Sequence, residues 1–133
     1  LLVRQWRTPA GRAMLEIPAG TLDRGPDGSI EPHARAARRE LEEETGYRAG
    51  TWRYLAGFWT APGFAAELMH LYLATDLVPA DGVQLGPDED ERLLLEHLPW
   101  EEAVRAATEG EIVDAKSILG LLWLARLKAS GQT

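Results

Sequence analysis

One helical segment limits the possible folds of this chain more than any other feature. Pro32 is a favourable first-turn residue, and Gly46 is a typical stop just after the last helical residue, Thr45. Loop-forming residues precede the segment in "PAGTLDRGPDGSIEP", and runs of aromatic and aliphatic residues follow it. The sequence therefore predicts a helix over residues 32–45, set between a loop and strands.

Strand patterns lie on both sides of this helix. Short strands are expected at residues 1–6 and 14–17, around a turn in "TPAGR". Later, "TWRYLAGFW" and "ELMHLYLAT" predict strands around the loop "TAPGFAA", and "RLLLEHL" predicts a strand after the acidic turn "GPDEDE". Two helices are expected at residues 100–107 and 114–127, and the second is apolar on most faces, so it should be buried or form an interface. Strands and helices without strict alternation predict an α+β fold or an α/β sandwich.

The composition limits the kinds of function. The 133 residues suffice for a single domain over residues 1–133, with 45% hydrophobic and 26% charged residues. A net charge of -7 disfavours binding to nucleic acid or to an anionic membrane. The absence of cysteine excludes disulfides, thiolate nucleophiles and cysteine-bound zinc. A phosphate ligand would therefore need a divalent cation to offset its charge.

The chain shows no signal for export or membrane insertion. No run approaches the roughly 18 apolar residues of a membrane span. The first residues, "LLVRQW", read as a strand already in progress rather than as a signal peptide. We expect a cytoplasmic protein with a further N-terminal segment upstream of Leu1.

Three glutamates share one edge of the expected helix. Because a helix turns about 100° per residue, Glu40, Glu43 and Glu44 fall within a sector of about 100°. They lie near the helix C-terminus, where the helix dipole disfavours negative charge. These carboxylates repel one another unless a cation sits among them. Two interpretations follow: a solvated acidic face or a metal site.

The other side chains of this helix complete its pattern. Arg38 can pair with Glu42 four residues later, and Arg39 can pair with Glu43 in the same way. The apolar stripe that should face the core comprises Ala34, Ala37 and Leu41.

The region around the helix resembles the Nudix box, the signature of hydrolases that act on nucleoside diphosphates linked to another group. Gly20 opens the pattern, seven residues separate Glu31 from Arg39, and "RELEEETGY" fills the remainder. The departure is the spacing between Gly20 and Glu31, where ten residues stand in place of five. A surface loop accepts such an insertion at small cost because closure entropy grows slowly with length. The role of Glu31 stays open at this spacing.

The resemblance implies a fold and a metal site. The Nudix fold is an α/β/α sandwich with a mixed sheet between helices. Glu40 and Glu44 would bind Mg²⁺ directly, or Mn²⁺ as the alternative, with two or more ions per site; hard oxygen ligands suit these metals. Glu43 would lie close by or act through water, and the Ala19 carbonyl would complete a first shell. Arg39 would hold Glu43 in place. Gly20 would form a tight turn.

A proline sixteen residues beyond Gly46 resembles the ADP-ribose pyrophosphatase branch of this family. Pro62 stands there, inside "TAPGF", and "LLVRQWR", "LEIPAGTL" and "EIVDAKSILGLLW" are similar to that branch as well. The resemblance implies that Arg7 contacts a phosphate or ribose of the substrate. It also implies that Glu67 binds the distal part of the substrate, next to Pro62 and Gly63.

The implied reaction is attack by water on one phosphorus of ADP-ribose, with AMP and ribose 5-phosphate as products. A base from the acidic loop is expected, with Glu89 favoured and Asp88 and Asp90 as alternatives. The complete protein should be a homodimer, because "ILGLLWLARL" has apolar surface to spare. Hydrolysis of another nucleoside diphosphate-sugar, such as GDP-mannose, is the main alternative. A module that binds ADP-ribose without cleaving it is the second.

Overall fold

A computed structural model describes residues 1–80 and 93–132 of the chain. The three α-helices and five strands within these ranges confirm the α+β class. The chain divides into two compact units, which are described separately. The first comprises residues 1–17 and 87–133, and the second comprises residues 18–86. Within the described ranges, no helix combines the length and the hydrophobicity that a bilayer span requires.

The first unit contains a three-stranded sheet. Strands β1 (Leu2–Arg7), β2 (Arg12–Glu16) and β5 (Leu94–Glu96) are arranged in the order β2-β1-β5, and both pairings are antiparallel. A short 3-10 turn, η1 (Thr8–Ala10), joins β1 to β2 and ends at Gly11, whose φ of 64° favours glycine. The expected strands and turn are confirmed, although β5 is shorter than "RLLLEHL" predicted.

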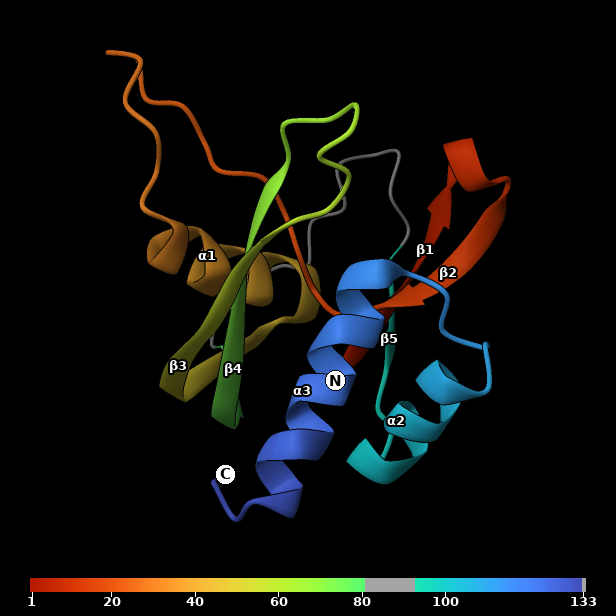
Figure 1. Cartoon of the computed structure of the whole chain (residues 1–133). Coiled ribbons are helices and arrows are strands. Elements are labelled where there is room, and N and C mark those ends of the chain that lie inside the picture. The colour runs from red at the N-terminus through yellow and green to blue at the C-terminus, as the bar shows by residue number, and fades with distance from the viewer. Residues whose placement is uncertain (81–92, 133) are drawn as a thin grey trace. The chain divides into compact units, whose positions relative to one another are not determined.

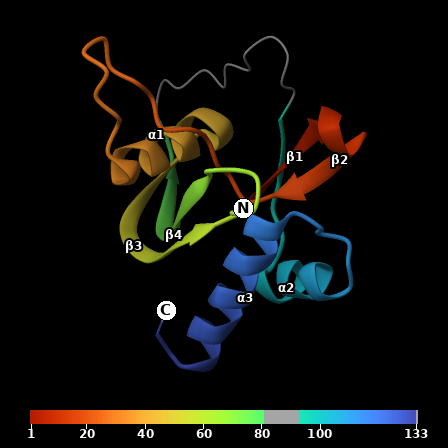
Figure 2. The same ribbon diagram turned by 45° about the horizontal axis from the view of Figure 1, so that its top comes forward.

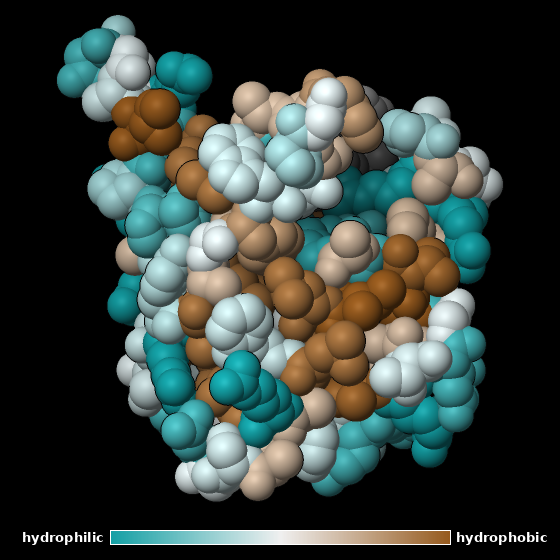
Figure 3. All heavy atoms as spheres, in the orientation of Figure 1, coloured by the Kyte–Doolittle hydropathy of each residue, from teal (hydrophilic) through white to brown (hydrophobic). Residues whose placement is uncertain are grey.

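Two helices complete this unit and supply its core. Helix α2 (Trp100–Thr108) and helix α3 (Ala115–Ala129) follow β5. Apolar side chains gather along α3 in Figure 3. As expected, part of α3 is buried, while Leu122 keeps 44% exposure. The buried core of the unit comprises Leu2, Ala103, Ala106, Ala107, Ile112 and Leu121.

The second unit is built from a helix and a long hairpin. Helix α1 (His33–Thr45) ends at Gly46, whose φ of 69° confirms the predicted stop. Strands β3 (Tyr47–Trp59) and β4 (Leu68–Pro79) pair antiparallel in a two-stranded sheet. Helix α1 lies beside this hairpin in both ribbon views (Figures 1 and 2) and packs on β3. The hairpin extends beyond the predicted strands because backbone hydrogen bonds between the strands also include residues at its ends, such as Arg48 and Val78.

Candidate active site

The inward side of helix α1 carries charge as well as apolar groups. Ala36, Leu41 and Thr45 are its buried residues. At about 100° per residue these three span half a turn, and Glu40 and Glu44 fall between them. The side chain of Glu40 is only 16% exposed. The expected stripe was wrong at Ala34, which is exposed in the first turn, whereas Leu41 is buried as expected.

Both inward glutamates meet the segment Ala19–Gly20. The Ala19 N–H donates a hydrogen bond to Glu44 Oε2 at 2.9 Å. A Cβ atom built on Gly20 would lie 1.9–2.1 Å from the Glu40 carboxylate atoms, so only glycine lets this carboxylate approach the backbone. The expected tight turn is not the reason for glycine here, since Gly20 lacks a positive φ. Two carboxylates one helical turn apart thus converge on one piece of backbone.

Arg39 links the remaining acidic groups of this region. Its Nη1 donates to Glu40 Oε1 at 2.8 Å and to Glu43 Oε2 at 2.9 Å, which confirms the predicted Arg39–Glu43 pair. Its Nη2 donates to Glu31 Oε2 at 2.9 Å and to the Thr21 carbonyl at 3.0 Å. The hydrogen bond to Glu31 is the main cause that raises the pKa of Arg39 above its usual value. One cation therefore serves three glutamates.

The long spacing before Glu31 folds into a small hairpin. Arg24 and Ile30 form an antiparallel bridge, and the Gly25 N–H donates to the Ser29 carbonyl at 2.9 Å. The Glu31 N–H then donates to the Asp23 carbonyl at 2.9 Å. Because the extra residues fold back on themselves, Glu31 still reaches Arg39. The Arg39 hydrogen bond lowers the pKa of Glu31, so this carboxylate remains charged.

The protein compensates the charge of Glu40 only in part. Burial raises its pKa, and hydrogen bonding by Arg39 offsets only part of that effect. The nearby Glu43 and Asp23 charges raise it further. A divalent cation beside Glu40 would remove this penalty, and carboxylate oxygens are suitable ligands for Mg²⁺.

The glutamates of this region are hydrogen-bonded to other groups of the protein. In residues 1–80 and 93–132, no three acidic or histidine side chains converge as a ready-made set of metal ligands. The reason lies in their partners: Arg39 holds Glu40 and Glu43, while the Ala19 N–H holds Glu44. The site suits a cation because its ligands would be carboxylate oxygens and because Gly20 lets the Glu40 carboxylate approach the backbone. To bind the cation, the glutamates would have to give up their present hydrogen bonds to Arg39 and to the Ala19 N–H.

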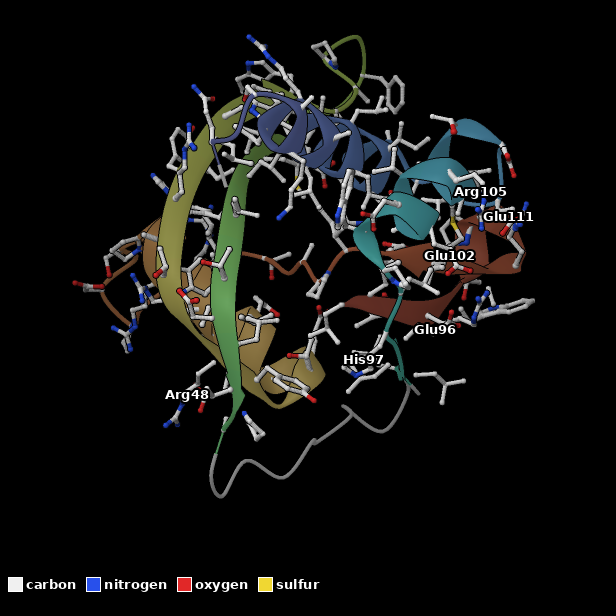
Figure 4. The ribbon with its side chains drawn as sticks, turned by 90° about the horizontal axis from the view of Figure 1, so that it is seen from below. Arg48, Glu96, His97, Glu102, Arg105 and Glu111 are labelled. Carbon is white, nitrogen blue, oxygen red and sulfur yellow. The ribbon has the colours of Figure 1, made fainter. Side chains whose placement is uncertain are left out.

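The expected pairing of Arg38 with Glu42 was wrong. Arg48 holds Glu42, with its Nε 2.8 Å from Oε2, and it projects from the edge of the hairpin sheet (Figure 4). Arg38 instead lies over the Trp52 ring, 5.2 Å from its centroid. The turn at Gly46 brings Arg48 back toward the end of the helix. Its planar guanidinium can there donate hydrogen bonds to both carboxylate oxygens of Glu42.

In the first unit, the structure fixes Arg7 through a residue that the sequence did not single out. Arg7 Nε and Nη2 donate to Glu16 Oε1 and Oε2, both at 2.8 Å. Glu16 is 1% exposed and also forms an ion pair with Lys116. Its position in the apolar run "MLEIP" was the available signal, because a charged residue at an inward strand position needs a buried partner.

The expected substrate residues after β3 lie around an open hollow in the second unit. Pro62 and Gly63 line it together with Trp59 and Phe64, and its volume is about 400 Å³. Phe64 is 92% exposed. Glu67 is exposed, does not line the hollow, and accepts a hydrogen bond from Thr60 Oγ1 at 2.5 Å. Asp88, Glu89 and Asp90, the expected base and its alternatives, lie outside the described residues.

Comparisons with known proteins agree with this arrangement. The chain is 40% identical over 124 residues to "Methanol dehydrogenase activator" of Bacillus methanolicus, and the match covers 93% of this chain and 64% of that protein. It is 38% identical over 125 residues to "ADP-ribose pyrophosphatase" of Bacillus subtilis (strain 168), again covering 93% of this chain and 64% of the relative. This chain thus spans somewhat less than two thirds of the length of either relative.

The fold also has a counterpart among solved structures. "Crystal structure of ADP compounds hydrolase" superposes with a TM-score of 0.78 at 26% identity, covering 99% of this chain and 68% of that one. The Nudix fold expected from the sequence is thereby confirmed. The family model described as "NUDIX domain" matches residues 1–120, which include the whole of "RELEEETGY", all of the second unit and most of the first. The chain belongs to the NUDIX domain family.

Proposed function

We propose that this chain hydrolyses the pyrophosphate bond of ADP-ribose or a related ADP-sugar in the presence of Mg²⁺, releasing AMP and the sugar phosphate, which is ribose 5-phosphate when the substrate is ADP-ribose. The observation that carries the proposal is the convergence of Glu40 and Glu44 on Ala19–Gly20, on the helix where Arg39 also binds Glu40 and Glu43. The printed name of the Bacillus subtilis relative and the ADP-compound hydrolase structure support the substrate class.

The residues that would hold the metal are Glu40, Glu44 and the Ala19 carbonyl, with Glu43 close by or acting through water. A bound divalent cation polarises the pyrophosphate and offsets the negative charge that develops during cleavage. Three carboxylates on this helix edge, those of Glu40, Glu43 and Glu44, could together bind two or more Mg²⁺ ions, or Mn²⁺ in their place. Arg39 binds Glu40 and Glu43 through one nitrogen atom and would orient both carboxylates.

The remaining residues would bind the substrate and activate water. Arg7 is assigned to a substrate phosphate, where a guanidinium offers paired donors. Glu67, Pro62 and Gly63 are assigned to the distal sugar, and Pro62 and Gly63 line the hollow in the second unit. A carboxylate of the acidic loop, with Glu89 favoured over Asp88 and Asp90, would take the proton from the attacking water. Glu43 and Arg39 would support this step through the metal site.

The two compact units would act together as one domain, since the family match includes all of the second and most of the first. We further propose that the complete protein is a homodimer, because α3 carries apolar residues such as the exposed Leu122. Light scattering across micromolar concentrations tests this proposal. A single species at the monomer mass throughout would contradict it.

A panel of sugar nucleotides tests the reaction. The protein is incubated with ADP-ribose, ADP-glucose, GDP-mannose and UDP-glucose in Mg²⁺ or in excess chelator, and the released nucleoside monophosphate is quantified. We expect AMP from the ADP compounds in Mg²⁺ and no turnover in chelator. Preferential release of GMP from GDP-mannose would transfer the proposal to that substrate. Tight binding of ADP-ribose without any cleavage would identify a binding module.

A further inference from the structure

The buried carboxylate of Glu16 lies between two cations. Glu16 is 1% exposed, and burial alone would raise its pKa. Hydrogen bonds from Arg7 and Lys116 outweigh that effect and lower the pKa to about 2. The side chain is therefore ionised at neutral pH, and its negative charge pairs with Arg7 and Lys116. An isolated buried carboxylate would be strongly unfavourable.

Arg7 approaches Glu16 along one face of the sheet. In the register of the β1–β2 pair, Arg7 lies opposite Arg12, while Glu16 lies opposite Val3. The Arg7 side chain thus extends back along the sheet rather than away from the end of β1. Two parallel hydrogen bonds of 2.8 Å fix the plane of its guanidinium. The side chain nevertheless keeps 37% exposure, so it is fixed and also reachable from solvent.

Glu16 itself is held on its other side. Lys116 forms ion pairs with Glu16 and, at 2.9 Å, with Asp114. Asp114 caps helix α3 by accepting from the Ser117 N–H at 3.0 Å. The Ile17 N–H donates to Ser117 Oγ at 2.8 Å, which anchors the residue that follows Glu16. Among the described residues, this cluster therefore contains two carboxylates and two cations, which hold one another in place.

We propose that Glu16 is a positioning residue for the substrate: it holds the Arg7 guanidinium in the orientation that receives a phosphate of the nucleoside diphosphate-sugar. The proposal rests on the proposed function, which assigns Arg7 to that phosphate. A long arginine side chain loses much rotamer freedom when it binds, and Glu16 removes that freedom beforehand. In the sequence, Glu16 precedes Ala19 by three residues, so the covalent chain joins this cluster to the segment that meets Glu40 and Glu44.

The test compares Glu16→Gln in two backgrounds. In the parent, the amide leaves Arg7 loosely held, and we expect KM for ADP-ribose to rise about tenfold while kcat changes by less than about twofold. In an Arg7→Met background, the same Glu16→Gln change should leave KM unaffected, because no guanidinium remains to be positioned. A purely structural glutamate would produce the same change in both backgrounds, and that result would overturn the proposal.

A matched control lies in the same sheet. Arg4 on β1 pairs with Glu96 on β5, which Figure 4 shows beside β1. Both side chains of this pair are more exposed than Glu16, with 40% for Arg4 and 30% for Glu96. Glu96→Gln removes an arginine–glutamate pair without touching Arg7, so we expect it to leave KM unchanged. An equal rise in KM with Glu96→Gln would contradict a specific role for Glu16.

A charge-balanced variant keeps the test possible if Glu16→Gln alone fails to fold. Glu16→Gln leaves Arg7 and Lys116 without their shared carboxylate, whereas Glu16→Gln with Lys116→Met removes one charge of each sign. If the single variant fails to fold, the double variant is compared with Lys116→Met alone, and the tenfold KM difference is expected between those two. An unchanged KM in active, folded protein would overturn the positioning role while the hydrolase function stands. Absence of turnover by the parent on every sugar nucleotide would overturn the proposed function itself.

Discussion

Arg39 in the second unit and Arg7 in the first both bind glutamates, but the charge balance around them is opposite. Arg39 is one cation in contact with three glutamates. Around Arg7, the single carboxylate of Glu16 is shared with a second cation, Lys116, whose charge Asp114 balances. Counted over the described residues, the first cluster has an excess of negative charge, and the second has equal numbers of positive and negative groups. An acidic excess that includes the half-buried Glu40 favours an added cation, whereas the described charges of the neutral cluster already balance one another.

The largest expected effect is on catalysis at the acidic cluster. Glu44→Gln keeps an acceptor for the Ala19 N–H but loses the charge of a proposed metal ligand. We expect turnover to fall roughly 10²–10³-fold, since several kcal/mol of barrier depend on the metal. The melting temperature should change little. Steady-state kinetics and thermal unfolding measure both quantities.

Glu42→Gln is the matched control on the same helix. Glu42 pairs with Arg48 on the outer side and belongs to neither cluster. Its turnover should equal that of the parent. Normal turnover by Glu44→Gln would show that the glutamates of α1 form a solvated acidic face.

The contribution of the neutral cluster around Glu16 to the free energy of unfolding should decrease in acid. Because the folded-state pKa of Glu16 is about 2 against 4.5 in the unfolded chain, its contribution to stability is complete above pH 4.5 and is lost as the pH falls toward 2. That contribution is about 3 kcal/mol. Urea unfolding should therefore separate the parent from Glu16→Gln at pH 7, and the gap should close near pH 2. A gap that persists in acid would mean that Arg7 and Lys116 do not stabilise the ionised carboxylate.

A smaller effect is expected when the cation of the acidic cluster is removed. Arg39→Gln leaves Glu31, Glu40 and Glu43 without their shared partner, and we expect a loss of about 2 kcal/mol in chelator, between the values for exposed and buried pairs. Added Mg²⁺ should stabilise this variant more than the parent, because it takes over the role of the arginine. Melting temperatures with and without Mg²⁺ test this difference.

Arg35→Gln provides its control. Arg35 faces Glu31 at 3.5 Å, but its side chain is 80% exposed, so its removal should cost almost nothing. Equal destabilisation by the two arginine variants would refute the distinction between a cluster centre and a surface pair.

The features predicted correctly from the sequence depend on neighbours a few residues away. Helix α1, its stop at Gly46 and the Arg39–Glu43 pair follow from local periodicity and capping. The long-range features could not be predicted, because they depend on which elements meet. Glu16 and Lys116 are one hundred residues apart in the sequence, and the stacked rings of His33 and His70, 3.9 Å apart, come from α1 and β4.

A second kind of error concerns competition between good partners. Arg38 stands four residues before Glu42, yet Glu42 pairs with Arg48. The turn after α1 brings Arg48 close to Glu42. Gly20 was expected to form a turn but is required by the approach of Glu40. In both cases the sequence identified the residue, and the tertiary structure determined its contact.

Binding of Mn²⁺, followed by electron paramagnetic resonance, tests the central claim most directly. The protein is titrated with Mn²⁺ in the presence and absence of a non-hydrolysable ADP-ribose analogue, and the free ion is quantified for the parent, Glu44→Gln and Glu42→Gln. We predict that the parent and Glu42→Gln bind Mn²⁺, more tightly with the analogue, and that Glu44→Gln loses most of this binding. Equal binding by all three proteins, or none by the parent even with the analogue, would contradict a metal site at the acidic cluster.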